Sequence, residues 1–312
     1  MERMKVSKFK SCAVALIFAA CGLAGCEKMV EFDVEEVTPK VVIVSRPDAD
    51  STVQVRLTYS RFFLDNHAFR TITDADVRLF ANGMQISPDS AGDGNYYFNC
   101  RPQPGDSMAL QVLAPGHDLV EAGTIVPSAP DFEVLEALYD SLTRTCHVKV
   151  RINDPKGSNY YQVSFEMWTV RHNNGNADDT VLVPIWISSE DMVFTDATSL
   201  DYMLDGGQTY VSGRKLSFSD ALFDGKAYTM EFEVWEMFMD MGAGILDPAF
   251  PIQVQLTALT RDRYQYDRTL KQSYEQEDFL SEPIQIFTNV KGGIGIFASA
   301  TAKKIPVKLS IK

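Results

Sequence analysis

The sequence predicts a mainly β protein with an N-terminal β-sandwich, a second and larger antiparallel β domain, and one helix near the C-terminus. Apolar and polar residues alternate with a period of two along much of the chain. Turn-forming pairs, among them Asn82-Gly83 and Asp93-Gly94, recur at short intervals. Strand and helix patterns do not alternate as a parallel α/β fold requires. Three segments are expected: a signal peptide at 1–25, a sandwich at 26–127 and a C-terminal domain at 128–312.

The N-terminus is typical of a bacterial lipoprotein signal peptide. A basic stretch that includes Arg3 and Lys10 precedes an apolar segment, 11–23, which is shorter than the roughly 20 residues of a membrane-spanning helix. Leu23-Ala24-Gly25-Cys26 then places small residues before a cysteine. We expect Cys26 to become the lipidated first residue of the mature protein. Several acyl chains would hold it in the membrane, because a single chain binds only marginally.

The composition restricts the classes of partner. The chain has 312 residues, 45% of them hydrophobic, which is enough for two domains with real cores. Its formal net charge is −13, and removal of the basic signal makes the mature chain still more acidic. Such a charge repels phosphate backbones, so nucleic acid is not expected as a partner.

The first domain is expected to follow Cys26 closely. Val30, Phe32 and Val34 alternate with acidic residues, which predicts either a first strand or an acidic linker. Clear alternation follows in Val53 to Tyr59 and in Met108 to Val112. Pro127 to Pro130 is the expected linker to the second domain.

The second domain is expected to contain longer and more aromatic strands. Expected strands are Val148 to Ile152, Asn159 to Arg171, Thr180 to Ser188, Ala227 to Met237, and a last one near Ile305 to Ile311. A helix is predicted at about 260–276, with Thr260 as its cap and Leu259 and Tyr264 at staple positions. Tyr266, Leu270 and Tyr274 share one face of this helix, which we expect to cover a sheet.

Two cysteines would remain as thiols in the mature protein, since Cys12 and Cys21 leave with the signal. Cys100 and Cys146 lie on strand-like segments, and in an oxidising compartment they form a candidate disulfide. The alternative is two buried free thiols in different domains. Two thiols are too few for a cysteine-based metal site, so no metal is expected.

Catalytic motifs were sought, and none was found in a supporting context. The histidines His67, His117, His147 and His172 stand in unrelated surroundings, and we expect no enzyme activity and no cofactor. A hydrolase using the acids Asp178, Asp179, Glu190 and Asp191 is a weaker alternative, because loop carboxylates are usually solvated. Asp89, Asp93 and Asn95 faintly resemble a calcium loop, but a hairpin turn explains them better.

One dinucleotide-like motif is rejected on context. The segment from Gly293 through Gly295 to Ala298 satisfies G-x-G-x-x-A and follows the strand-like Ile284 to Phe287. Too little chain remains for the helix and second strand that a nucleotide site requires. We expect these glycines to permit a tight bend before the last strand.

Tryptophans and methionines supply the candidate contact residues for a ligand or a partner. Trp168 and Trp235 fall on the polar side of their strands by alternation, and Trp186 sits opposite Val183 and Ile185. Exposed, they would form a stacking platform for a sugar or a docking patch for a protein. If a helix or a second sheet covers the tryptophans, they are core residues instead. Met237, Met239 and Met241 are either an adaptable contact loop or a strand end.

The two ends of the mature chain resemble a known family. Cys26 to Val34 followed by the strand 41–44, and Glu282 to Phe297 with Asn289 ahead of Gly292-Gly293, are similar to Gram-negative lipoproteins catalogued as domain of unknown function 4249. The resemblance extends over essentially the whole mature chain. Ala298 departs from the family, where glycine is common after the phenylalanine.

This resemblance implies an outer-membrane lipoprotein whose N-terminal sandwich is immunoglobulin-like or carboxypeptidase-regulatory-like. Such proteins tend to be encoded beside TonB-dependent transporters, and no catalytic residues carry over to this chain. The resemblance therefore favours a non-catalytic accessory that captures substrate or docks on a transporter, facing either the periplasm or the cell surface. The alternative is a surface structural or adhesion lipoprotein that binds glycan or protein without a transporter. The genomic neighbourhood would separate the two.

Overall fold

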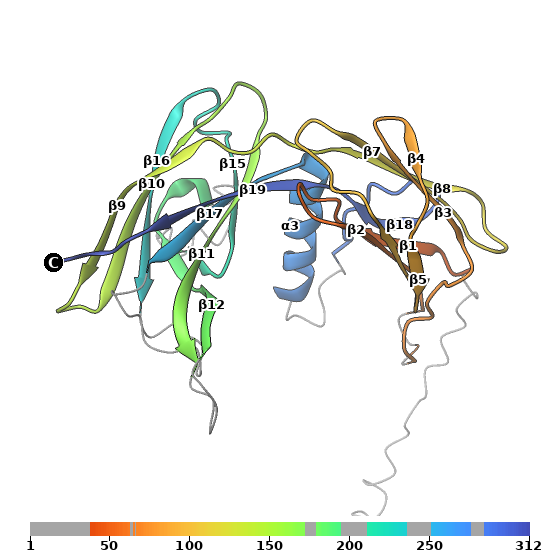
Figure 1. The fold of residues 1–312 in the computed structure, drawn as a ribbon, viewed down its shortest axis with the longest axis horizontal. Helices are drawn as coiled ribbons and strands as arrows, with labels where there is room; N and C mark the ends of the chain where they lie inside the picture. Colours follow the sequence, from red (N-terminus) through yellow and green to blue (C-terminus); the bar gives the residue numbers. More distant parts are fainter. Residues whose placement is uncertain are drawn as a thin grey trace, which may run out of the picture. The chain divides into compact units, whose positions relative to one another are not determined.

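The computed structural model in Figure 1 confirms a mainly β chain with several antiparallel sheets and one helix near the C-terminus. It describes residues 38–62, 65, 67–171, 179–194, 211–235, 251–275 and 284–312. Residues Pro39–Lys312 form one compact unit. The expected signal peptide, Cys26 and the alternating segment from Val30 to Val34 lie outside the described residues.

The first sandwich consists of two sheets, which we call sheet A and sheet B. Sheet A has the order β18-β1-β2-β6-β5, and sheet B has the order β4-β3-β7-β8. The strands of sheet A are β1 (Val41–Ser45), β2 (Val53–Tyr59), β5 (Ser90–Gly92), β6 (Asn95–Phe98) and β18 (Ile294–Phe297). The strands of sheet B are β3 (Asp76–Ala81), β4 (Met84–Ile86), β7 (Ser107–Leu113) and β8 (Val120–Ile125).

Local sequence patterns account for most of this sandwich. In β2, Val53, Val55 and Leu57 are fully buried while the residues between them are exposed, as the alternation predicts. Asn82 and Gly83 join β3 to β4 with φ angles of 50° and 81°. Positive φ at both central residues is the geometry of a type I′ hairpin turn, so this predicted turn is confirmed.

Strand β18 returns from the far end of the sequence to complete the first sandwich. It pairs in parallel with β1, and Gly295 lies opposite Ile43. A Cβ on Gly295 would stand 2.0 Å from the Ile43 carbonyl oxygen, and its φ is +115°. The predicted role of this glycine in a bend is therefore wrong, because it permits the close approach of two strands. The expected strand Ile284 to Phe287 is also wrong, since no strand forms there.

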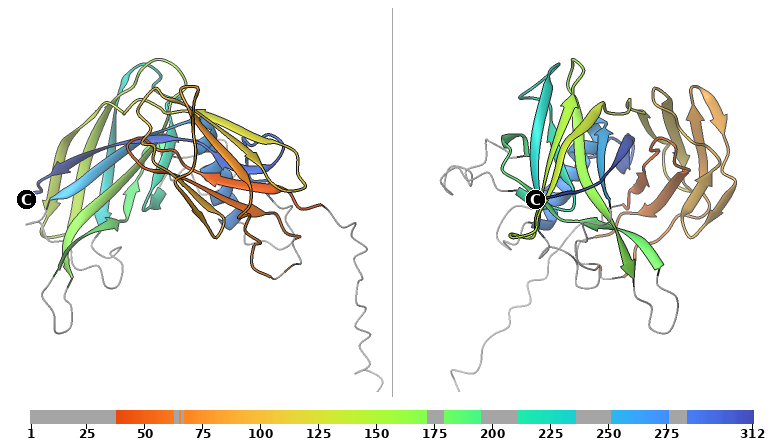
Figure 2. Two further views of the ribbon diagram at one scale, coloured as in Figure 1. Left: turned by 45° about the vertical axis from the view of Figure 1, so that its right-hand side comes forward. Right: turned by 60° about the vertical axis from the view of Figure 1, so that its left-hand side comes forward.

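The second sandwich also has two sheets, and Figure 2 shows its strands from two further directions. Sheet C has the order β14-β13-β16-β10-β9-β20; sheet D has the order β12-β11-β17-β19, with β15 beside β11. The strands of sheet C are β9 (Phe132–Asp140), β10 (Thr145–Asn153), β13 (Ile187–Ser189), β14 (Val211–Gly213), β16 (Ala227–Trp235) and β20 (Ser310–Ile311). The strands of sheet D are β11 (Tyr160–Arg171), β12 (Asp179–Ile185), β15 (Leu216–Ser219), β17 (Ile252–Leu259) and β19 (Ala300–Val307).

Aromatic side chains fill the space between sheets C and D. Phe165 of sheet D and Phe232 of sheet C meet edge to face, with ring centroids 5.2 Å apart. Phe194, in the short 3₁₀ helix η1 (Met192–Phe194), packs on both Phe218 and Phe232. Each such pair adds about 0.5–1.5 kcal/mol to the stabilisation from burial. This core is separate from the core of the first sandwich.

Helix α3 (Arg261–Glu275) begins where the sequence predicts. Thr260 caps it, because its hydroxyl accepts a hydrogen bond from the Arg263 amide at 3.3 Å. The expected apolar stripe is only partly correct, since Tyr266 is half-buried whereas Tyr274 is 81% exposed. The helix has no fully buried residue, but Tyr264 packs on Tyr160 of β11 with ring centroids 4.8 Å apart, so the expected contact with a sheet is present in part.

Ion pairs and hydrogen bonds hold α3 against the first sandwich and the returning segment. Arg263 pairs with Asp267 at 2.8 Å and with Asp48 at 3.7 Å. Burial raises the pKa of Asp48, and the Arg263 charge opposes that rise. Asn289 donates to Asp262 at 3.0 Å and to the Phe297 carbonyl at 2.8 Å. The asparagine of the family-like end motif thus ties α3 to β18.

The candidate disulfide is not formed, because both cysteines are free. Cys146 lies in the core of the second sandwich, and Cys100 packs at the margin of the first. Burial raises the pKa of the Cys146 thiol to about 12. The two thiols are free, as the alternative has it, and they belong to different hydrophobic cores, although Cys100 is only half-buried.

Candidate functional site

The predicted contact residues separate into described and undescribed groups. Trp168 is 38% exposed and Trp186 is 37% exposed, so neither is covered as a core residue would be. Trp235 ends β16, and its side chain lies outside the described residues. The predicted contact residues Met237, Met239 and Met241 also lie outside the described residues. The same is true of Asp178 and of the expected lipidation residue Cys26. Glu190 is exposed, and the Asp191 carboxylate accepts hydrogen bonds from the Tyr228 hydroxyl at 2.5 Å and from the Glu231 amide at 3.2 Å.

Trp168 belongs to the outward face of sheet D. Phe165 and Met167 are fully buried, so alternation places Glu166 and Trp168 on the opposite side of β11. Trp168 lies opposite Leu182 of β12. Trp186 follows directly after β12, where the chain leaves sheet D for β13 of sheet C.

Apolar, charged and neutral polar groups share this face with Trp168. Glu166 lies opposite Pro184 on one side and Gln253 on the other, and Ser164 lies opposite Gln255. On the described part of this face, Lys304 forms an ion pair with Glu166 at 2.8 Å. We call this set the sheet D face: Ser164, Glu166, Trp168, Leu182, Pro184, Gln253, Gln255, Lys304 and Pro306.

The outward face of sheet C has a different character. His147, Lys149 and Arg151 of β10 point away from the core and each meets a glutamate. His147 lies 3.5 Å from Glu233, Lys149 lies 3.1 Å from Glu231, and Arg151 lies 2.6 Å from Glu133. These pairs form a solvated ladder of charge, as predicted for His147. Exposed pairs of this kind contribute little to stability.

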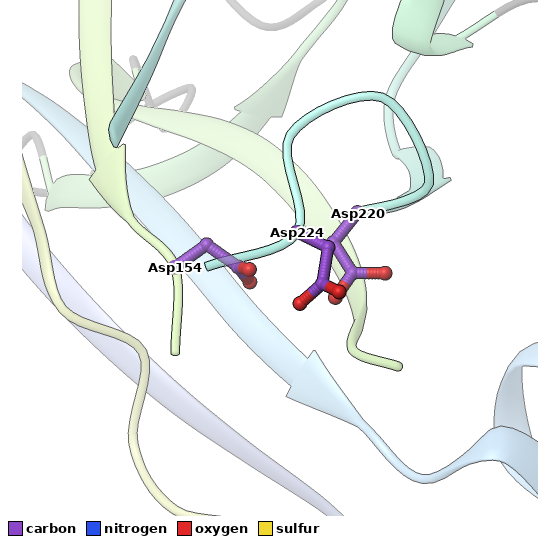
Figure 3. A group of neighbouring side chains, drawn as sticks. All are labelled: Asp154, Asp220 and Asp224. Carbon is purple, nitrogen blue, oxygen red and sulfur yellow. The ribbon is translucent and has the colours of Figure 1, made fainter. Parts of the chain in front are cut away.

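A cluster of three aspartates lies where β10 ends and β16 begins (Figure 3). Asn153 pairs with Ala227, so the loops that follow and precede these strands are adjacent. Asp154, Asp220 and Asp224 place one carboxylate oxygen each within 4.8 Å of the others. Asp154 and Asp220 are buried. Within the described part of the chain, this is the acidic group that could hold a metal ion.

Protein donors already occupy these carboxylates. Asp154 accepts hydrogen bonds from the Tyr161 hydroxyl at 2.6 Å and from the Gly225 amide at 2.8 Å. Asp220 accepts from the Asn159 amide at 2.8 Å and from its side chain at 3.1 Å. Burial raises the pKa of Asp220, and the Asn159 hydrogen bonds oppose the rise. The cluster therefore links the loop that follows β10 to the loop that precedes β16 through hydrogen bonds.

The sequence patterns did not predict this cluster. Asp154 and Asp224 are separated by 70 positions, and each stands near Pro155 or Gly225 in a segment typical of a turn. Only the pairing of β10 with β16 brings them together. The one available signal was Gly225, because the amide of a glycine in a tight turn can donate a hydrogen bond to a buried carboxylate, here that of Asp154.

Comparison with known proteins gives one family and little beyond it. The model of a family described as Domain of unknown function (DUF4249) matches residues 27–305. The chain belongs to this family. The match confirms the resemblance carried by the two ends of the chain, and the DUF4249 chain has the β-sandwich architecture described above. No curated protein matches it.

A solved structure adds no functional argument. The DUF4249 chain is similar to a β-glucuronidase from glycoside hydrolase family 2, with 10% identity and a TM-score of 0.18. That likeness covers 72% of this chain and 19% of the β-glucuronidase chain. In the described parts of the chain, no helix combines the length and apolar character that crossing a bilayer demands.

Proposed function

We propose that this protein is a non-catalytic, lipid-anchored accessory of an outer-membrane uptake system. It would capture substrate or dock on a TonB-dependent transporter. The observation that carries the proposal is Trp168, which is 38% exposed on a sheet face that it shares with Leu182, Glu166 and Gln253. A large aromatic side chain in such a position costs solvation free energy that a bound partner would recover.

The sequence supports the anchoring part of the proposal. Leu23-Ala24-Gly25-Cys26 ends a basic and apolar segment, and lipidation at Cys26 would restrict the protein to partners at the membrane. The non-catalytic part is supported by the aspartate cluster, whose carboxylates are engaged with protein donors. His147 likewise faces Glu233 in the charge ladder.

Affinity purification from native membranes in mild detergent tests the proposal. The wild-type protein should bring down a stoichiometric barrel partner and should incorporate an alkyne-labelled fatty acid. The Cys26→Ser variant should lose the label and the membrane fraction. Recovery of a lone monomer from membranes would contradict docking, and it would favour a structural or adhesion lipoprotein instead.

A further inference from the structure

The sheet D face differs from the rest of the second sandwich in the kind of hydrogen bonding that it offers. On sheet C, three cationic side chains of β10 are matched by glutamates. On sheet D, the central strands present Glu166, Gln253 and Gln255, and the Glu166 charge is paired with Lys304. A ligand on sheet D would therefore meet hydrogen-bonding groups without needing to supply a countercharge.

The registers fix how these groups are arranged around Trp168. Strand geometry places rows on one face about 7 Å apart along a strand and neighbours about 5 Å apart across strands. Leu182 lies across from Trp168, and the next row contains Pro184, Glu166 and Gln253 in that order. One flat aromatic ring thus lies one row away from a carboxylate and an amide that are themselves neighbours.

Gln253 leaves its hydrogen-bonding capacity unused. It is half-buried, and its side-chain amide has no hydrogen-bond partner among the residues that the structure describes. By contrast, the Gln255 amide donates to the Thr257 hydroxyl at 3.1 Å. A partly desolvated amide gains more from a ligand hydroxyl than a fully hydrated one, because less water must be displaced.

We propose that the sheet D face binds an uncharged polysaccharide, with a sugar ring stacked on Trp168 and hydroxyls bonded to Glu166 and Gln253. The face of an indole ring is electron-rich and apolar, which suits the C–H face of a pyranose. The ring edge of the same sugar requires donors and acceptors, and the adjacent row supplies both. This inference rests on the proposed capture function and names the class of its ligand.

Charge excludes the nearest alternative ligand. The whole chain carries a formal net charge of −13, so an acidic polysaccharide would be repelled over most of the surface. A protein partner is less suited to this face, since protein interfaces have a continuous apolar centre with few charged groups. Here the ion pair between Glu166 and Lys304 lies on the face itself, with the two side chains 26% and 41% exposed.

Affinity gel electrophoresis of the whole mature protein provides the test. The probes are soluble uncharged polysaccharides, namely dextran, galactomannan and xyloglucan, with polygalacturonate as the charged comparison. At least one uncharged polymer should retard the wild type, and the Trp168→Ala variant should bind it about tenfold more weakly. Tyr97→Ala is the matched control, since Tyr97 is an aromatic residue of the first sandwich that is 44% exposed.

Two further variants separate binding from folding. Trp168→Phe should retain part of the affinity, and Gln253→Ala should weaken binding while leaving the thermal unfolding temperature unchanged. Retardation by polygalacturonate alone, or equal retardation of Trp168→Ala and wild type by every uncharged polymer, would overturn the inference. Failure of all uncharged polymers to bind would overturn it as well. Co-purification of a barrel partner would then still support the proposed function, so the two failures are distinguishable.

Discussion

The two sandwiches of this chain have the same architecture but are stabilised in different ways. The first is completed by β18, whose backbone fits against β1 only because position 295 is glycine. The second has long antiparallel strands and a core in which Phe165, Phe194, Phe218 and Phe232 contact one another across the two sheets. The first sandwich therefore needs one close backbone contact in addition to its apolar core, and the second depends on the volume of its aromatic side chains.

The largest expected effect removes side-chain volume from the second sandwich. Phe232 is 1% exposed and contacts aromatic rings from sheet D and from η1. Phe232→Ala should lower the free energy of unfolding by about 3–5 kcal/mol, measured by urea denaturation. The control is Phe69→Ala in the first sandwich, where the ring is 53% exposed and the expected change is within about 0.5 kcal/mol. Equal losses of unfolding free energy in the two variants would show that buried aromatic volume does not distinguish the second sandwich.

A smaller effect is expected from the backbone fit in the first sandwich. The new Cβ of Gly295→Ala would collide with the Ile43 carbonyl, and the residue would have to keep its φ of +115°. We expect a loss of about 2–4 kcal/mol in the free energy of unfolding. Gly83→Ala separates the two causes, because its φ is +81° and nothing lies within 4 Å of its Cβ. That variant should lose about 1–2 kcal/mol, and a loss as large as that of Gly295→Ala would show that the close approach is unimportant.

The smallest effect concerns the pH dependence of the second sandwich. Burial, with the Asp154 and Asp224 charges adding to it, raises the pKa of Asp220 above its ordinary value of 3.8. A raised carboxyl pKa favours folding below the unfolded pKa, and this contribution is lost as the pH rises through the folded pKa. The amide side chain in the Asp220→Asn variant does not ionise, so this variant does not lose that contribution to stability as the pH rises. Its stability relative to wild type should therefore increase as the pH rises above about 4.

Urea denaturation at several pH values measures this difference. Asp131→Asn provides a comparison, since the Asp131 side chain is 70% exposed and lies outside the cluster. A difference between Asp220→Asn and wild type that does not vary with pH, or that shrinks as the pH rises, would contradict the assigned pKa direction.

Local features of the fold could be predicted from the sequence because they depend on neighbouring residues. The Asn82-Gly83 turn requires positive φ at adjacent positions, and the Thr260 cap requires a hydroxyl before the first helical turn. The pairing of β18 with β1 joins residues about 250 positions apart, and a glycine pattern alone does not identify its partner strand. The aspartate cluster escaped prediction for the same reason.

The candidate site was predictable in part. Alternation alone placed Trp168 on the polar side of β11, and the structure finds it exposed there. Its neighbours Gln253 and Leu182 could not be named, because strand order and register are properties of the whole sheet. Trp186 shows the same limit, since the predicted strand Thr180 to Ser188 divides there between sheets D and C.

We propose the outward face of sheet D, and not that of sheet C, as the binding surface. The chain has three tryptophans, and Trp168 and Trp235 lie on strands of the two different sheets. Nitrogen-15 labelling of their indole groups, with each resonance assigned by a tryptophan-to-phenylalanine variant, reports on one strand of each sheet in one NMR titration with an uncharged polysaccharide. We predict that the Trp168 resonance shifts while the Trp235 resonance stays in place. A shift of Trp235 alone, or no shift at Trp168 under saturating polysaccharide, would contradict it.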